Sequence, residues 1–198
     1  MTRAFVRVAK VGGSLFDYTE LPTVLRVWLA DQPGITVLIA GGGAAAEFIR
    51  EADARFSLGE PVSHRLCLTA MRTSAKLLLA LLPEAALVTT LADLQEAIGS
   101  RRTGLVVFDV EHFASVISEV ALPRDWSVTS DSIAAHTASV LGARELVLFK
   151  SVALPPNTSR EDTSDSGLVD AYFCEAMGQG TAVRWVNLRS DPPAERPL

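Results

Sequence analysis

Residues 4–15 have the sequence Ala-Phe-Val-Arg-Val-Ala-Lys-Val-Gly-Gly-Ser-Leu, which predicts a buried strand that ends on Lys10 and then a sharp turn. Two glycines leave this turn without side chains, so its backbone N–H groups can approach an anion beside the Lys10 ammonium. A tight strand–helix turn with a solvated lysine is the alternative, because glycine pairs are common in ordinary turns. The stretch therefore predicts either a phosphate-binding turn or a purely structural one.

A second strand–glycine–helix unit follows at residues 35–56. An apolar run at 35–40 leads into three consecutive glycines at 41–43, and a helix begins after them. The predicted apolar face of this helix consists of Phe48, Ile49, Ala52 and Phe56. Two such units in succession predict βαβ architecture with a mostly parallel sheet. Both glycine turns then lie at the carboxyl ends of strands, where open α/β sheets bind ligands.

The rest of the chain continues to alternate between helices and strands. Apolar periodicity predicts helices at 63–82, 91–98, 132–141 and 169–177, and strands at 86–89, 105–110, 146–149 and 182–188. Residues 155–166 are rich in Pro, Ser, Thr and Asp, which predicts a loop. Residues 191–198 contain three prolines and are predicted to form a disordered tail. The other residues, 1–190, are predicted to form a single domain.

The composition is typical of a well-buried globular protein, because 48% of the 198 residues are hydrophobic. A net charge of −5 and the lack of a basic cluster argue against a nucleic-acid-binding surface. Cys67 and Cys174 are far apart and have no CxxC partner, so we expect neither a metal site nor a disulfide. No segment has the length of an apolar membrane span and no signal-peptide pattern begins the chain. These features predict a soluble, cytoplasmic protein that does not bind a membrane.

Lysine is rare in this chain, with three lysines among 18 basic residues. Lys10 and Lys150 each close an apolar strand-like run, whereas Lys76 lies in the middle of a predicted helix. A lysine that is retained where arginine is otherwise preferred can be required for its compact ammonium. At the end of a buried strand, Lys150 requires an anionic partner, and both a phosphate and Asp131 are candidates.

Ser130 and Asp131 stand at the predicted start of the helix over 132–141, where Ser130 is a suitable N-cap. One interpretation is a capped helix end with an acidic residue that complements the helix dipole. The other places the Asp131 carboxylate between the ammonium groups of Lys10 and Lys150.

Two further patterns leave alternatives open. His64 and Arg65 lie in the first turn of a predicted helix, where an Arg could hold a substrate carboxylate or phosphate or form a surface ion pair. Residues 41–46 match the loose G-x-G-x-x-A dinucleotide pattern, which favours an NAD(P)-binding oxidoreductase. That alternative is weakened because no strand ends on an acidic residue at the expected distance, and it leaves Lys10 unexplained.

Three motifs in order resemble the amino acid kinase family over roughly residues 4–188. They are Lys10-Val-Gly-Gly-Ser, Ala40-Gly-Gly-Gly and Thr129-Ser-Asp-Ser-Ile-Ala-Ala. Ser63-His-Arg with Ala70-Met, and Gly167-Leu-Val-Asp-Ala-Tyr-Phe, are most similar to the small aminomethylfuran-phosphate-kinase-like branch, which acts in methanofuran biosynthesis.

The resemblance implies a three-layer αβα sandwich with a mainly parallel central sheet. It also implies a kinase that transfers the γ-phosphoryl group of MgATP to a phosphate or carboxylate on a small molecule, with aminomethylfuran phosphate as a candidate acceptor. ATP and Mg²⁺ are the implied cofactors. The Mg²⁺ would be held mainly by the ATP phosphates, without a metal site of the protein. A homodimer or higher homo-oligomer is implied as well.

The resemblance also implies roles for individual residues. The implied catalytic residues are Lys10, Asp131 and Lys150. The implied phosphate- and nucleotide-binding residues are Gly12, Gly13, Ser14, Gly42, Gly43, Ser130 and Ser151. The implied substrate-binding residues are Gly41, His64 and Arg65.

The sequence departs from the family at one motif. The family commonly has Thr-Asp-Val-Asp-Gly after the strand that ends here on Lys150, and this chain has Lys150-Ser-Val-Ala-Leu in its place. The acidic residues and the glycine that would contact the nucleotide are absent. A catalytically degenerate relative that binds a nucleotide or phosphate is therefore an alternative to an active kinase.

Overall fold

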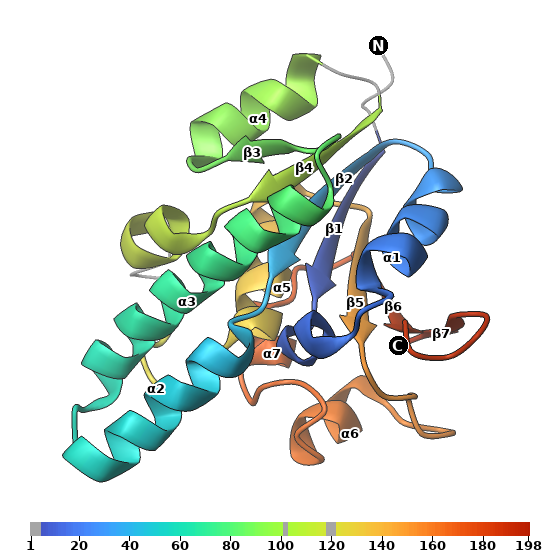
Figure 1. Ribbon diagram of the computed structural model, residues 1–198. Coiled ribbons are helices and arrows are strands. Elements are labelled where there is room, and N and C mark those ends of the chain that lie inside the picture. Colours follow the sequence, from blue (N-terminus) through green and yellow to red (C-terminus); the bar gives the residue numbers. More distant parts are fainter. Residues whose placement is uncertain (1–4, 101–102, 118–121) are drawn as a thin grey trace.

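The computed structural model describes residues 5–100, 103–117 and 122–198. Within these ranges a seven-stranded sheet has the order β3-β4-β2-β1-β5-β6-β7 (Figure 1). All neighbouring strands from β3 to β6 are parallel, and β7 is antiparallel to β6. The strands are β1 (Val6–Val11), β2 (Ile35–Ala40), β3 (Ala86–Val88), β4 (Gly104–Phe108), β5 (Glu145–Lys150), β6 (Ala182–Asn187) and β7 (Ala194–Pro197).

Helices cover both faces of the sheet (Figure 1). They are α1 (Leu21–Ala30), α2 (Gly43–Phe56), α3 (Glu60–Leu81), α4 (Leu91–Ser100), α5 (Ser130–Leu141), α6 (Arg160–Asp165) and α7 (Phe173–Ala176). A 3-10 helix, η1 (Gly13–Asp17), follows β1, and a π-helical turn, η2 (Phe113–Ile117), follows β4. The buried side chains of α1 join one core cluster and those of α5 and α7 join the other. The predicted three-layer αβα sandwich with a mainly parallel sheet is confirmed.

The alternation of side chains along β1 and β5 determines where the two strand-end lysines point. Val6 and Val8 of β1 face the same core cluster as α5, and Lys10 follows them at the same two-residue period. Lys10 pairs in register with Leu148 of β5. Lys150 lies two residues further along β5, so its side chain points to the same face as that of Leu148. Both lysines therefore emerge at the carboxyl edge of neighbouring strands, on the face that α5 covers.

Three segments differ from the expectations. The predicted helix at 169–177 is reduced to α7, Phe173–Ala176. The predicted disordered tail at 191–198 contains β7, because Glu195 accepts a hydrogen bond from Trp28 Nε1 and forms an ion pair with Arg184 at 2.9 Å. The predicted loop at 155–166 contains α6, whose first turn is stabilised by a reciprocal capping box between Ser159 and Asp162. No helix in the described part of the chain is long and apolar enough to cross a membrane.

Candidate active site

Lys10, Asp131 and Lys150 form one buried ionic cluster. The Lys10 ammonium lies 3.0 Å from Oδ1 of Asp131, and the Lys150 ammonium lies 2.9 Å from Oδ2. The three side chains are only 6%, 7% and 12% exposed. The predicted meeting of two lysines at one carboxylate is therefore confirmed, although 140 positions separate Lys10 from Lys150 in the sequence.

The electrostatics of the cluster depend on burial and on the charges within it. Burial alone would raise the pKa of Asp131, but the ammonium groups of Lys10 and Lys150 outweigh it and hold that pKa below its usual value. Burial, and then repulsion from Lys10, lower the pKa of Lys150 to about 8 in spite of the attraction of Asp131. At neutral pH the cluster therefore holds two positive charges and one negative charge, so it favours an additional anion.

The two glycine turns contact each other beside this cluster. A Cβ atom on Gly13 would lie 2.5 Å from the backbone N of Gly43, and one on Gly41 would lie 2.7 Å from the backbone N of Gly13. Gly43 also has a φ of +58°, which side chains disfavour. The glycines are required because two backbone turns approach within contact distance at the ends of β1 and β2.

The N–H groups available to an anion are fewer than the resemblance implied. Gly12 donates its N–H to the Phe149 carbonyl at 2.9 Å, and Gly41 donates to the Val11 carbonyl at 2.9 Å. Both bonds extend the hydrogen bonding between neighbouring strands by one residue, so the prediction that Gly12 offers its N–H to phosphate is wrong. Gly13 begins η1 and Gly43 begins α2, where a helix leaves its first N–H groups without intrahelical partners.

Ser14 and Ser151 contact each other next to the first glycine turn. Their hydroxyl oxygens are 2.8 Å apart, and Arg189 donates to the Ser14 carbonyl at 2.9 Å. Arg189 also forms an ion pair with Asp17 at the end of η1. The residue predicted to begin the nucleotide site, Ser151, is thus joined through Ser14 to the turn that carries Gly13.

A cavity of about 510 Å³ opens between the glycine turns, α2, α3 and the start of α5. Lys10, Asp131 and Ser130 line it, and so do Gly13, Ser14, Gly42 and Gly43. Its other walls combine apolar side chains (Phe16, Leu68, Met71, Trp126, Val128 and Ile133) with polar ones (Asp17, Glu47, Arg50 and His64). Among the described residues, only Asp131 lies within ion-pair distance of Lys10, so the Lys10 ammonium retains N–H groups for a ligand in this cavity.

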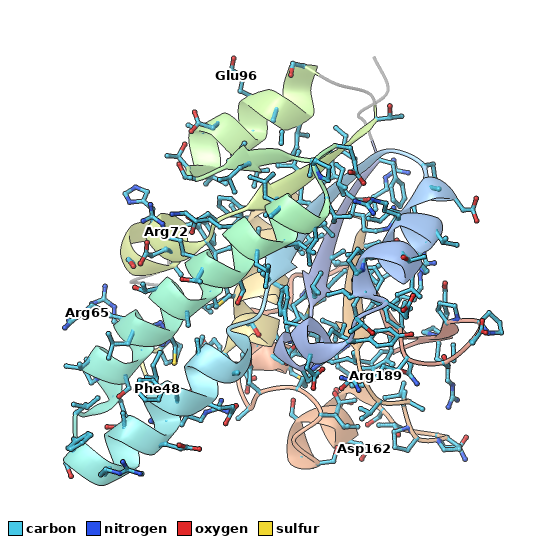
Figure 2. All side chains as sticks on the ribbon, viewed as in Figure 1. Phe48, Arg65, Arg72, Glu96, Asp162 and Arg189 are labelled. Atoms are coloured by element: carbon cyan, nitrogen blue, oxygen red, sulfur yellow. The ribbon has the colours of Figure 1, made fainter. Side chains whose placement is uncertain are left out.

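The structure separates the two candidate substrate-binding residues of α3. His64 lines the cavity, whereas Arg65 lines a different cavity of about 670 Å³ together with Arg72, Asp109 and Glu111. Figure 2 shows Arg65 and Arg72 on the same outer side of α3. Consecutive helical residues point in directions about 100° apart, which is why His64 and Arg65 line different cavities. The structure therefore does not bring Arg65 to the cavity that Lys10 and His64 line.

His64 is a neutral group in this cavity. Its pKa lies below the ordinary value, first because it is partly buried and then because the nearby positive charge of Arg124 disfavours the imidazolium. The attraction of Asp125 opposes these effects without reversing them. At pH 7 His64 can therefore donate or accept a hydrogen bond but does not supply a charge.

Three residues near the site were missed by the sequence analysis. Arg50 of α2 lies over the ring of Trp126 at 5.3 Å, and both line the cavity. Asp170 accepts hydrogen bonds from both ends of the first turn of α5, whose N-cap is Thr129 and not the predicted Ser130. The motif at 167–173 was a signal for Asp170, but its partners were not evident because they lie about 40 positions away.

The described residues also limit how a cation could be held. No three His, Cys, Asp or Glu side chains among them lie close enough together to bind a metal ion. The anion-binding groups, in contrast, converge at the Lys10–Asp131–Lys150 cluster and the starts of η1 and α2. These groups could hold the phosphate of a ligand.

The sequence and the fold are similar to those of several kinases. Over 148 residues the chain is 25% identical to [5-(aminomethyl)furan-3-yl]methyl phosphate kinase of Methanocaldococcus jannaschii, a match that covers 74% of this chain and 66% of that protein. The chain therefore matches slightly less than two thirds of that relative. No protein-family profile matches the sequence.

Solved structures with a similar fold include two nucleotide kinases. Uridylate kinase from Archaeoglobus fulgidus superposes with a TM-score of 0.63 at 14% identity, covering 90% of this chain and 89% of that one. UMP kinase from Ureaplasma parvum superposes with a TM-score of 0.65 at 11% identity, covering 97% and 93%. Aspartate kinase from Synechocystis gives a TM-score of 0.60 at 15% identity, and the match covers 96% of this chain but 39% of that larger one.

Proposed function

Because the chain has the fold of the amino acid kinase family and a sequence relative within it, we propose that it is a small-molecule kinase. It transfers the γ-phosphoryl group of ATP to a phosphate or carboxylate oxygen of the acceptor. The observation that carries this proposal is the Lys10–Asp131–Lys150 cluster beside two contacting glycine turns.

The chemistry requires alignment and charge balance more than covalent participation by the protein. An anionic acceptor oxygen forms a bond to the γ-phosphorus while the bond to the bridging oxygen of ADP breaks, so no proton has to be removed. Lys10 and the N–H groups of Gly13 and Gly43 stabilise the negative charge on the transferring group. Asp131 keeps the two ammonium groups close together in spite of their repulsion. Mg²⁺ bound to the ATP phosphates would supply further positive charge.

For the acceptor we propose [5-(aminomethyl)furan-3-yl]methyl phosphate or a close analogue. The sequence relative acts on this compound according to its name. The cavity supports the choice because its volume of about 510 Å³ suits a small ring compound, and Leu68, Met71 and Trp126 provide an apolar wall. The product would be the corresponding diphosphate ester, an intermediate suited to a methanofuran-type pathway.

A catalytically degenerate phosphate-binding protein is the second candidate. The residues after β5 favour this candidate. Ser151 forms a hydrogen bond with Ser14 there, and the acidic motif that the kinase family commonly has at this place is absent. The NAD(P)-binding interpretation of residues 41–46 receives no support from the comparisons, because the similar proteins above are kinases.

The proposed function is tested by ³¹P NMR of the purified protein with MgATP and a panel of acceptors. The panel contains the furan phosphate, simple phosphomonoesters and small carboxylic acids. We expect ADP together with the paired resonances of a diphosphate ester for the furan phosphate. Hydrolysis of ATP to free phosphate alone, or no change with any acceptor, would contradict the proposal. Thermal stabilisation by ATP without transfer would favour the degenerate relative instead.

The pKa of Lys150 gives the reaction a predicted alkaline limit. Because the free protein loses the Lys150 proton at about pH 8, kcat/KM for MgATP should be level below this pH and fall about tenfold per unit above it. The rate falls at high pH because only the ammonium form of Lys150 attracts the phosphates of ATP. Steady-state kinetics from pH 6 to pH 10 measure the profile. In the Lys150→Arg variant the level region should extend beyond pH 9, whatever its absolute rate. The same alkaline limit in wild type and variant would exclude Lys150 as its source.

A further inference from the structure

The segment between α6 and α7 contacts Lys150 and the helix turn that carries Asp131. We call residues 167–170, Gly-Leu-Val-Asp, the 167–170 segment. Leu168 and Val169 donate their N–H groups to the Thr163 carbonyl of α6, and Val169 is only 3% exposed. On the other side, Phe173 donates its N–H to the Asp170 carbonyl at 3.2 Å. The segment is therefore held at both ends by hydrogen bonds and burial.

The Asp170 carboxylate caps α5 from a distance in the sequence. Its Oδ2 accepts hydrogen bonds from Thr129 N at 2.9 Å, Thr129 Oγ1 at 2.7 Å and Ser132 N at 3.0 Å, and its Oδ1 accepts one from Ser132 Oγ. The N-cap residue itself, Thr129, makes no capping bond with its side chain. Asp131 lies between the two residues that Asp170 holds. Charged hydrogen bonds on both sides thus fix the turn from which the Asp131 carboxylate projects.

The same segment also binds the second lysine. The Leu168 carbonyl accepts a hydrogen bond from the Lys150 ammonium at 2.6 Å, while Asp131 Oδ2 accepts another at 2.9 Å. The Trp185 ring lies 5.1 Å from the same ammonium. These contacts leave one N–H of Lys150 for a ligand. The negative charge of Asp170 also favours the protonated form of Lys150, adding to the effect of Asp131 and opposing that of Lys10.

We propose that Asp170 is a positioning residue for phosphoryl transfer: through the first turn of α5 and through Leu168 it orients Asp131 and Lys150 together. The proposal rests on the proposed function for its kinetic consequences, but the orientation and charge of Lys150 can be measured without turnover. The 167–170 segment then links the position of the Asp131 carboxylate to that of the Lys150 ammonium.

The test uses Asp170→Asn, with Asp162→Asn as a matched control. Asp162 also caps a helix with its carboxylate, but it does so on the exposed α6 and touches none of the three clustered residues. We expect Asp170→Asn to lower kcat by roughly 10- to 100-fold with a smaller change in the KM of the acceptor, because misplaced groups lose alignment. In Asp170→Asn, the pH above which kcat/KM for MgATP falls should be lower than in wild type. Asp162→Asn should match wild type in both respects.

Lysine NMR provides the readout that does not depend on activity. With ¹³C-labelled lysine, the three lysines of the chain give few signals, and Lys150→Arg assigns one of them. The pKa of Lys150 should be lower in Asp170→Asn than in wild type, because a nearby negative charge is removed. A folded Asp170→Asn with unchanged kcat and an unchanged Lys150 pKa would overturn the proposal. If wild type shows no turnover, the NMR result still decides the positioning role.

Ser132→Ala covers the case in which Asp170→Asn does not fold. Ser132 is fully buried, and its replacement removes one hydrogen bond to Asp170 while the negative charge remains. We expect a several-fold loss of kcat with no shift of the Lys150 pKa. An unchanged kcat in this variant would overturn the proposal.

Discussion

Replacing Lys10 by Met is expected to lower kcat by about 10³-fold or more, with little change in the fold. Groups that stabilise charge on a transferring phosphoryl or an oxyanion are usually worth 10²- to 10⁵-fold. Lys10 is 6% exposed, has Asp131 as its partner, and lines the cavity beside Gly13 and Gly43. Methionine preserves most of the side-chain volume but removes the ammonium. Single-turnover transfer of ³²P from ATP measures the loss.

The matched control for this prediction is Lys76→Met. Lys76 is the remaining lysine of the chain and lies exposed in the middle of α3. Its replacement should leave kcat within about twofold of wild type. Equal activities of Lys10→Met and wild type would show that the cluster does not act on the phosphoryl group, and would favour a non-catalytic protein.

Replacing Asp131 by Asn should destabilise the protein by about 3–5 kcal/mol at pH 6, because two buried ammonium groups lose their counter-charge. The loss should be smaller at pH 9. In the folded variant a lysine can release its proton, whereas the unfolded chain still binds it, so stability rises with pH over this range. Urea unfolding followed by circular dichroism at the two pH values measures both effects. Activity should be lost as well.

Two comparisons make the Asp131 result specific. Glu84→Gln removes the carboxylate of an exposed ion pair, in which Arg26 and Glu84 are 44% and 48% exposed, and should cost less than about 1 kcal/mol. Adding Lys150→Met to Asp131→Asn should recover part of the stability, because one unpaired charge is removed. A loss for Asp131→Asn no larger than that for Glu84→Gln would contradict a buried three-charge cluster.

The strand ends and glycine turns could be predicted from the sequence because their signals are local. An apolar run that stops at a glycine pair indicates both the strand and the turn, and parallel topology then brings the strand ends together. The interpretation that placed the Asp131 carboxylate between the ammonium groups of Lys10 and Lys150 started from two strand ends and one helix start, and the structure brings these three side chains together. These predictions depended on backbone geometry, which neighbouring residues largely determine.

Predictions failed where the environment of a side chain depends on distant elements. Phe48 and Phe56 were predicted to share an apolar face with Ile49, but they are 70% and 68% exposed, since periodicity does not show whether another element covers a helix. Likewise, no local pattern shows that the N–H of Gly12 is used by Phe149. The cap that Asp170 provides for α5 could not be inferred either, because its partners are remote in the sequence.

The central claim is that Lys10 and Lys150 together bind the phosphoryl group in transfer. It is tested most directly by NMR of the ¹³C-labelled lysines in the presence of Mg²⁺, the furan phosphate and the non-hydrolysable analogue β,γ-imido-ATP. The signals of Lys10 and Lys150 should both shift, and the pKa of Lys150 should rise from about 8, because an anion now lies beside it. Lys76 should not respond. Unchanged Lys10 and Lys150 signals at saturating ligand, with the Lys150 pKa still at about 8, would contradict the claim.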